Sequence, residues 1–169
     1  MILKSNYLHT LIIKKATLKI ACIPAYNEEK YIGNLVESAK KYVDKVIVCD
    51  DGSTDNTAQL AKKAGATIIS HKKNKGYGAA ITTLFDYARK ENVNIMVTLD
   101  GDGQHNPDQI PLLINAITIH NVHVAIGSRF LDSGTEAPGY RKTGIKIITS
   151  TSNYGTNLKV SDSQSGFRA

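Results

Sequence analysis

Short apolar runs alternate along the chain with segments in which apolar residues recur at helical spacing. The five runs with the length and residue types of buried strands are 18–23, 46–49, 67–70, 95–99 and 123–127. Between them, apolar residues repeat every three or four positions, which is typical of helices that turn one face toward a core. This alternation predicts a mostly parallel central sheet with helices on both faces, an α/β fold.

Four helices are predicted between and after these strands. Ser53 or Asp55 is expected to cap the second helix, and Gly65 is expected to end it. Pro107 suits the first turn of the fourth helix. The helical residues predicted to face the core are Ile32, Leu35, Val36, Ala39 and Val43; Leu60, Ala61 and Ala64; Ile81, Leu84, Phe85 and Ala88; and Ile110, Leu113, Ile114 and Ile117.

The chain has the size and composition of one globular domain, with 169 residues of which 41% are hydrophobic and 21% charged. No apolar run approaches the roughly 20 residues that a membrane-spanning helix needs. Residues 1–17 are interpreted as an N-terminal extension rather than a signal peptide, because lysines interrupt their apolar positions and no small-residue cleavage site follows. Residues 18–169 form the predicted domain.

The formal net charge of +6 suits a phosphorylated substrate or an anionic membrane surface. The lysines are spread along the sequence and only 7% of residues are aromatic, so the chain lacks the basic and aromatic stripe of single-strand nucleic-acid binders. Nucleic acid is therefore not an expected partner. Cys22 and Cys49 lie at the ends of apolar runs and are predicted to be free core thiols. His71 and His123 are interpreted as ordinary residues.

Five carboxylates follow three of the predicted strands. Because ligands of open α/β sheets bind beyond the carboxyl ends of the strands, these side chains are expected at one edge of the sheet. They are Glu28 after the first strand, Asp50 and Asp51 after the second, and Asp100 and Asp102 after the fourth. Their mutual repulsion would raise their pKa values unless a cation lay among them.

Asp100 and Asp102 are separated by one residue in a glycine-containing turn, with Gln104 or His105 close by. Oxygen ligands favour a hard cation, so we expect Mn²⁺ or Mg²⁺ held by one or two carboxylates and by substrate phosphates. An isolated Asp-x-Asp turn is more typical of an ordinary loop than of a metal site. Its position directly after a strand is what favours a metal site.

Five short motifs occur in an order and spacing that carry a family resemblance. They are Ile23-Pro24-Ala25-Tyr26-Asn27-Glu28, Asp50-Asp51-Gly52-Ser53-Thr54-Asp55-Asn56-Thr57, Asp100-Gly101-Asp102-Gly103-Gln104-His105, Gly127-Ser128-Arg129-Phe130 and Ser165-Gly166-Phe167-Arg168. From about Leu18 onward the chain resembles the family 2 glycosyltransferases of the GT-A fold, and most of all the dolichyl-phosphate mannose and glucose synthases. The resemblance implies a Rossmann-like α/β sandwich that binds a UDP- or GDP-sugar.

The same resemblance implies roles for the motif residues. Pro24, Ala25, Tyr26 and Glu28 would line the nucleoside pocket. Asp50 or Asp51 would hold the base or the ribose, and the sequence leaves open which. The residues implied to touch the donor diphosphate or its metal are Asp100, Asp102 and Gln104, with Asp102 also assigned a catalytic role and His105 as an alternate ligand.

The long segment 128–143 is rich in Gly, Pro, Ser and charged residues, and its length is typical of a functional lid. Arg129 and Arg141 on it would bind donor phosphate through their planar guanidinium groups, and Arg129 is also assigned a catalytic role. Solvated loop charge is the alternative for both. Lys75, beside Gly76 at a predicted helix start, either helps to bind the anionic donor or belongs to an ordinary turn.

Asp162 begins a segment that resembles the acceptor-site motif of the same family, with Ser163 where that motif usually has proline. If the acceptor is a sugar hydroxyl, Asp162 is the expected general base, because the hydroxyl loses its proton as it attacks. If the acceptor is a lipid phosphate, the nucleophile is already anionic and Asp162 would position groups instead. A third interpretation is that Asp162 caps a turn.

The expected function is inverting transfer of one hexose from a UDP- or GDP-sugar to a polyprenyl phosphate such as dolichyl phosphate, with Mn²⁺ or Mg²⁺ as cofactor. The protein is expected in the cytoplasm, peripherally at the membrane face, where its basic residues approach anionic lipid. The alternatives are a family 2 transferase that acts on a polysaccharide or glycolipid hydroxyl, and a non-catalytic nucleotide- or metal-binding domain. Because the family usually continues beyond the acceptor motif, we expect the domain to be truncated after Ala169.

Overall fold

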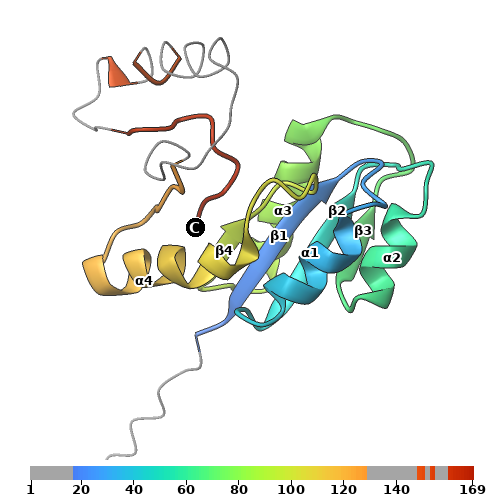
Figure 1. The fold of residues 1–169 in the computed structure, drawn as a ribbon, viewed down its shortest axis with the longest axis horizontal. Helices are drawn as coiled ribbons and strands as arrows, with labels where there is room; N and C mark the ends of the chain where they lie inside the picture. Colours follow the sequence, from blue (N-terminus) through green and yellow to red (C-terminus); the bar gives the residue numbers. More distant parts are fainter. Residues whose placement is uncertain (1–16, 129–147, 151–152, 155–159) are drawn as a thin grey trace, which may run out of the picture.

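A four-stranded parallel sheet forms the centre of the molecule (Figure 1). The computed structural model describes residues 17–128, 148–150, 153–154 and 160–169. The strands are β1 (Lys19–Ala25), β2 (Lys45–Asp50), β3 (Thr67–Ser70) and β4 (Ile95–Thr98), in the spatial order β3-β2-β1-β4. They match the first four predicted strands to within two residues at each end.

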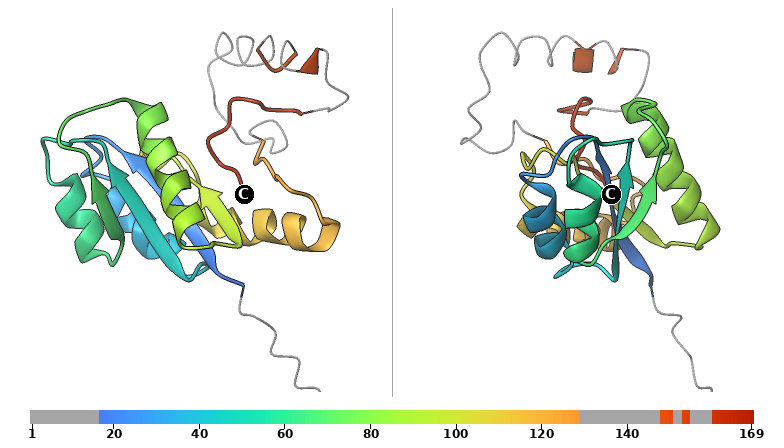
Figure 2. Two further views of the ribbon diagram at one scale, coloured as in Figure 1. Left: turned by 180° about the vertical axis from the view of Figure 1, so that it is seen from behind. Right: turned by 90° about the vertical axis from the view of Figure 1, so that its right-hand side faces the viewer.

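Helices cover both faces of this sheet (Figure 2). The helices α1 (Ile32–Ala39), α2 (Thr57–Lys63) and α4 (Ile110–His120) pack on one face, with the 3-10 turn η1 (Pro107–Gln109) leading into α4. The helix α3 (Tyr77–Lys90) packs on the other face. Alternate residues of β1 supply the two cores, since Ala21 and Ile23 face α1 while Ile20 and Cys22 face α3.

The two cysteines are free and buried, as the sequence predicts. Burial raises the pKa of the Cys22 thiol to about 12. Burial and then the charges of Asp51 and Asp50 raise the pKa of Cys49 to about 11. Both thiols are therefore protonated at neutral pH and act as small apolar core residues.

The chain end adds an antiparallel segment to the edge of β4. The N–H of Thr98 donates to the carbonyl of Arg168 (2.8 Å), and on the other side Ala125 and Ala169 exchange two hydrogen bonds of 2.8 Å. The predicted fifth strand, 123–127, is therefore wrong as a regular strand: Ile126 forms only an isolated bridge to Arg168. The segment 167–169 lies along the edge of β4 instead, where Thr98 and Arg168 exchange two backbone hydrogen bonds.

Three local predictions about helices are also wrong. Phe85 of α3 is predicted to face the core but is 56% exposed. The first helix ends at Ala39 rather than near Val43, because Tyr42 donates its N–H to the Ala39 carbonyl (3.0 Å) in a tight turn. Neither Ser53 nor Asp55 is the N-cap residue of α2, which is Asn56. Ser53 Oγ accepts the N–H of Asn27 from the turn after β1. Asp55 accepts the N–H of Glu29 from the same turn, and its other oxygen accepts the N–H of Thr57, the first residue of α2.

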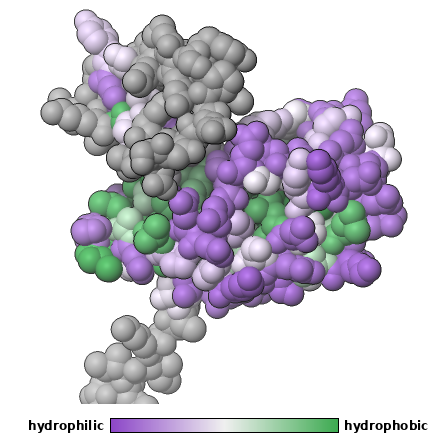
Figure 3. All heavy atoms as spheres, in the orientation of Figure 1, coloured by the Kyte–Doolittle hydropathy of each residue, from purple (hydrophilic) through white to green (hydrophobic). Residues whose placement is uncertain are grey.

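The helix α4 is apolar on more than its core-facing side. Exposed apolar residues on and just after it gather at the end of the molecule that α4 occupies (Figure 3), and they are Leu112, Ile119, Val122 and Val124. Among the residues that the structure describes, no helix is long and apolar enough to cross a membrane.

Candidate functional site

A cleft of about 1240 Å³ opens at the carboxyl ends of the strands. Its walls come from the ends of β1 and β2, from α3 and from the segment 163–169. The cavity continues along β4 to residues 94–96 and to residues 117 and 121–124, at and after the end of α4. The carboxyl ends of the strands form the edge at which ligands of parallel α/β sheets bind. The charged side chains that line it are Glu28, Asp51, Asp100, Asp102 and Arg168, so four of the five predicted carboxylates share one cavity.

The motif residues after β1 and those after β2 are joined by hydrogen bonds. The N–H groups of Asn27 and Glu28 donate to Ser53 Oγ (3.0 Å) and Thr57 Oγ1 (2.7 Å). In return the N–H of Thr54 donates to Asn27 Oδ1 (2.9 Å). Asn27 has a φ of 56°, a left-handed backbone conformation that Asn tolerates better than most residues. These polar motif residues therefore build the rim that carries Tyr26 and Glu28.

The two adjacent aspartates after β2 differ in position. Asp50 is 6% exposed and its Oδ1 accepts the N–H of Ser53 (3.1 Å), which closes the turn. Asp51 lines the cleft, and its carboxylate accepts the N–H groups of Lys75 (3.0 Å) and Gly76 (2.8 Å). Burial raises the pKa of Asp51, but hydrogen bonds from His71, Lys75 and Gly76 outweigh it and the net pKa is lowered. Asp51 is thus the member of the pair that lines the cleft.

Asp100 and Asp102 lie in an open turn after β4. The hydroxyl of Tyr77 donates to Asp100 Oδ1 (3.1 Å), and the N–H of Asp100 donates to His105 Nδ1 (3.1 Å). The His105 ring stacks on Phe167, with ring centroids 5.4 Å apart, so it braces this turn. Asp102 Oδ1 accepts the N–H of Gln104 (3.0 Å).

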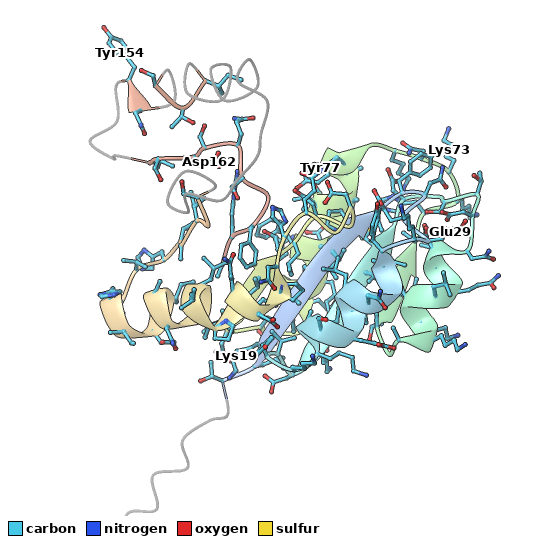
Figure 4. All side chains as sticks on the ribbon, viewed as in Figure 1. Lys19, Glu29, Lys73, Tyr77, Tyr154 and Asp162 are labelled. Carbon is cyan, nitrogen blue, oxygen red and sulfur yellow. The ribbon has the colours of Figure 1, made fainter. Side chains whose placement is uncertain are left out.

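Tyr77 belongs to the cleft although its sequence position gave no signal of a role. It stands at the start of α3 beside the turn after β4 (Figure 4). Burial, followed by the charge and hydrogen bond of Asp100, raises its pKa to about 12. The phenol is therefore neutral at physiological pH and remains a hydrogen-bond donor to Asp100.

The donor set fits a hard divalent cation shared with a substrate. Burial, and then the charges of Asp102 and Asp55, raise the pKa of Glu28, so negative charges repel one another in this part of the cleft. Within the described ranges, no three His, Cys, Asp or Glu side chains are already grouped as a complete metal cage. Asp100 and Asp102 offer two carboxylates and Gln104 offers an amide oxygen. Mg²⁺ and similar ions are commonly held by one or two carboxylates together with substrate phosphate oxygens.

Comparison with known proteins decides the family. The sequence profile described as "Glycosyl transferase family 2" matches residues 20–169. The chain belongs to glycosyl transferase family 2. This membership agrees with the resemblance carried by the five motifs, and it places the chain among glycosyltransferases rather than metal or nucleotide sensors.

Among similar curated proteins is the UDP-N-acetylglucosamine–dolichyl-phosphate N-acetylglucosaminyltransferase of Methanococcus voltae, 34% identical over 167 residues that cover 87% of this chain and 66% of the relative. Another is the polyprenol monophosphomannose synthase of Mycolicibacterium smegmatis, 29% identical over 160 residues that cover 89% and 60%. The chain thus spans about three fifths to two thirds of the length of these relatives.

The fold is that of GT-A glycosyltransferases. Glucosyl-3-phosphoglycerate synthase from Mycobacterium tuberculosis superimposes with a TM-score of 0.70 at 24% sequence identity, covering 90% of this chain and 56% of that one. At this identity the likeness concerns the fold alone. It confirms the predicted Rossmann-like α/β sandwich.

The residues of the segment that resembles the family's acceptor motif differ in whether they reach the cleft. Ser163 and Gln164 line the cleft, whereas Asp162 is fully buried and its Oδ1 accepts the N–H of Gln164 (3.1 Å). Ser163, which stands at the usual proline position, donates its N–H to Thr149 Oγ1 (3.1 Å). Figure 4 marks Asp162 on this C-terminal segment. The carboxylate therefore shapes the turn that presents its neighbours.

Arg168 is a cleft residue to which the sequence gave no individual role. Its Nε donates to the carbonyl of Ser165 (2.7 Å) and its Nη2 to that of Ser163 (2.9 Å), and its charge opposes the rise in the Tyr77 pKa. Among the described lining residues it is the one permanently cationic side chain. Its position after Gly166 and Phe167 gave no signal of a separate role. The antiparallel pairing of Arg168 with Thr98 brings it to the cleft.

Asp50 and Gln104, two of the predicted site residues, are not among the described residues that line this cleft. Arg129 and Arg141 fall outside the described residues. Lys75 lines a separate, smaller hollow together with Ser70, His71, Lys72 and Lys73, although its backbone N–H holds Asp51. His123, interpreted as ordinary, lines the cleft near the end of α4.

Proposed function

We propose that this chain is the donor-binding domain of an inverting hexosyltransferase that uses a divalent cation and a UDP- or GDP-sugar. The observation that carries the proposal is the convergence of Glu28, Asp51, Asp100 and Asp102 from three strand ends in one cleft of a family 2 chain. Four carboxylates against one arginine make the cleft strongly acidic. An anionic nucleotide sugar fits such a cleft only together with a cation.

The proposal assigns the cation to Asp100, Asp102 and Gln104, with donor phosphates completing its ligands. Bound there, Mn²⁺ or Mg²⁺ would stabilise the charge that develops on the departing diphosphate. Support comes from the solved glucosyl-3-phosphoglycerate synthase, which was crystallised with Mn²⁺, UDP and glucosyl-3-phosphoglycerate. Tyr77 donates its hydroxyl hydrogen to the Asp100 carboxylate, and Gly166 lies so close to that carboxylate that a Cβ at position 166 would overlap it.

The nucleoside would lie along Pro24, Ala25, Tyr26 and Glu28, which line the cleft beside Asp51. Asp51 would accept a hydrogen bond from the base or the ribose. Arg168 would face the donor or acceptor phosphate with the guanidinium N–H groups that do not hold the Ser163 and Ser165 carbonyls. Arg129 and Arg141 remain proposed phosphate ligands.

The proposed acceptor is a polyprenyl phosphate such as dolichyl phosphate. Two relatives named above are named for dolichyl-phosphate and polyprenol phosphate chemistry. In addition, Asp162 is fully buried, which suits positioning of Gln164 better than removal of a proton from a hydroxyl. A phosphate oxygen needs no base, so it can attack the anomeric carbon directly, opposite the leaving diphosphate, with inversion. Such an acceptor would place the protein peripherally at the cytoplasmic membrane face.

The test compares two acceptors that differ only in the nucleophile. The protein, Mn²⁺ and each of UDP-glucose, UDP-N-acetylglucosamine and GDP-mannose are incubated with a polyprenyl phosphate or with the matching polyprenol. We expect sugar transfer to the phosphate alone, and Asp162→Asn should keep substantial turnover. Transfer to a hydroxyl or glycan acceptor, with the roughly 10²–10⁴-fold loss on Asp162→Asn that a general base implies, would establish the hydroxyl-acceptor alternative instead.

A further inference from the structure

His71 lies where the parallel register of β2 and β3 puts it beside Asp51. Asp50 pairs with Ser70 in that register, so the next residues, Asp51 and His71, leave the sheet side by side. His71 Nδ1 lies 2.6 Å from Asp51 Oδ1, and the two side chains are only 7% and 4% exposed. A carboxylate can only accept hydrogen bonds, so Nδ1 carries the hydrogen and donates it to Asp51.

The other side of the imidazole is fixed to α3. His71 Nε2 lies 3.0 Å from Thr83 Oγ1, and Thr83 is itself anchored by donating its hydroxyl hydrogen to the Ala79 carbonyl (3.0 Å). The Sγ of Cys49 on β2 lies 3.8 Å from the same nitrogen. The ring therefore connects the end of β3, the cleft carboxylate of β2 and the body of α3, which restricts its rotation.

The hydrogen bonds to Asp51 leave a lone-pair position on its carboxylate for a ligand. Among the described contacts, Oδ1 of Asp51 accepts from His71 Nδ1 and from the N–H of Lys75, which fill its two lone-pair positions. Oδ2 accepts from the N–H of Gly76, which leaves one lone-pair position on that oxygen. Because Asp51 lines the cleft, Oδ2 is the atom that can accept an N–H or O–H from a bound nucleotide.

We infer that His71 is a positioning residue of the donor site: by holding Oδ1 of Asp51, it directs Oδ2 toward the nucleoside of the bound nucleotide. This inference rests on the proposed nucleotide-sugar function. Without the His71 hydrogen bond, Oδ1 would keep the Lys75 N–H and Oδ2 the Gly76 N–H. Both donors come from the loop that leads into α3, so the carboxylate would be held from that side alone and its direction would be less firmly fixed. The consequence is a loss of nucleotide affinity rather than a loss of fold.

The test uses two variants of similar size that each keep one of the two ring contacts. The amide nitrogen of Asn overlays Nδ1, so His71→Asn keeps the donor to Asp51 and loses the Thr83 contact. The longer Gln places its amide near Nε2, so His71→Gln keeps the Thr83 contact and loses the Asp51 donor. Affinities of UDP and of GDP, each with MnCl₂, are measured by calorimetry on the 169-residue chain, and thermal unfolding is measured in parallel.

For the nucleotide that the parent chain binds, His71→Asn should stay within about threefold of the parent, whereas His71→Gln should bind about tenfold more weakly, the loss expected when a hydrogen bond to a charged group is removed. Both variants should unfold at similar temperatures, because each loses one buried hydrogen bond. In the Asp51→Asn background, His71→Gln should cause no further loss, because the contact it removes is already altered.

Equal affinities of the two His71 variants, or an undiminished affinity of Asp51→Asn, would overturn the inference while leaving nucleotide binding intact. Failure of the parent chain to bind either nucleotide would overturn the proposed function together with it. Thr83→Val covers the case in which His71→Gln does not fold. It removes the Nε2 contact and the Thr83–Ala79 hydrogen bond but keeps the His71–Asp51 contact, so it should bind like the parent. A tenfold loss in Thr83→Val would show that positioning does not act through Asp51.

Discussion

The carboxylates after β2 and those after β4 lie at the same edge of the sheet but are held in different ways. Asp51 is 4% exposed, and its oxygens accept two backbone N–H groups and the His71 ring. Asp100 is 33% exposed. Tyr77 donates a hydrogen bond to its Oδ1, and His105 Nε2 lies 3.8 Å from its Oδ2. One carboxylate is thus fixed by the protein, and the other keeps much of its surface open.

This difference indicates two kinds of recognition in one cleft. A buried carboxylate with lowered pKa is ionised at neutral pH and fixed in direction, which suits a specific hydrogen bond to a base or ribose. An exposed pair on a glycine-containing turn retains oxygen lone pairs for a cation that arrives with the substrate. Substitutions of Asp100 or Asp102, after β4, should therefore have the largest effect on nucleotide binding. Substitution of Asp51, after β2, should also lower the stability of the fold.

The largest effect is expected from Asp102→Asn. Removing one of two carboxylates that hold the cation should weaken Mn²⁺-dependent nucleotide binding about 100-fold, the upper range for changes at metal sites. Calorimetric titration with nucleotide and Mn²⁺ measures the change, with Asp86→Asn on the exposed side of α3 as the control. Undiminished metal-dependent affinity of Asp102→Asn would remove the β4 side from the cation site.

Asp51→Asn should show how much the carboxylate after β2 contributes to the stability of the fold. The introduced amide group faces backbone N–H donors, so the variant should lose about 1–3 kcal/mol of unfolding free energy, the cost of leaving a buried polar group unsatisfied. Urea unfolding measures it, and Asp102→Asn serves as the comparison because its side chain is more exposed. Equal losses in the two variants would contradict the proposed division between the sides.

Gly166→Ala should test whether the position of the Asp100 carboxylate matters for binding of the cation and nucleotide. A Cβ at Gly166 would overlap the Asp100 carboxyl group, with its Cγ only 2.6 Å away. Overpacking of this kind costs about 1–3 kcal/mol, and displacement of Asp100 should weaken Mn²⁺-dependent nucleotide binding roughly tenfold. Gly78→Ala is a matched control, because a Cβ at Gly78 meets nothing within 4 Å. A loss of affinity that is equal in both variants would point to a general effect on folding.

The smallest expected effect is on acid stability. The folded pKa of Asp51 is lowered below the ordinary value of 3.8, so its ionised form is favoured by folding. That contribution is complete above pH 3.8 and is lost as pH falls through the lowered folded pKa. The stability difference between the parent and Asp51→Asn should therefore shrink below pH 3.8, measured by urea unfolding. A difference that stays constant down to the acid transition would contradict the lowered pKa.

Local patterns were sufficient to predict the strands and the acidic edge. The alternation of strand and helix patterns predicted β1 to β4, and the position of Asp100 and Asp102 directly after β4 predicted their place in the cleft. These predictions succeeded because they depend on residues close together in sequence and on the general rule that parallel strands share one ligand edge.

Contacts between distant segments could not be predicted. The role of His71 depends on the register of β2 against β3, which a spacing of twenty residues does not reveal. The fifth strand was mispredicted because residues 167–169, some forty positions later, take the edge of β4. Similarly, Ser53 looked like a helix cap but accepts the N–H of Asn27 across the rim.

The most direct test of the account is whether nucleotide sugars bind to the 169-residue chain in a way that depends on a divalent cation. Thermal unfolding is followed with UDP-glucose, UDP-N-acetylglucosamine or GDP-mannose, in the presence of Mn²⁺ or of EDTA. Because a ligand that binds only the folded state raises its stability by about 2.7 kcal/mol at a hundred times Kd, at least one donor should raise the unfolding temperature by several degrees with Mn²⁺ and far less with EDTA. Equal shifts with Mn²⁺ and EDTA, or no shift with any of the three donors, would contradict the account.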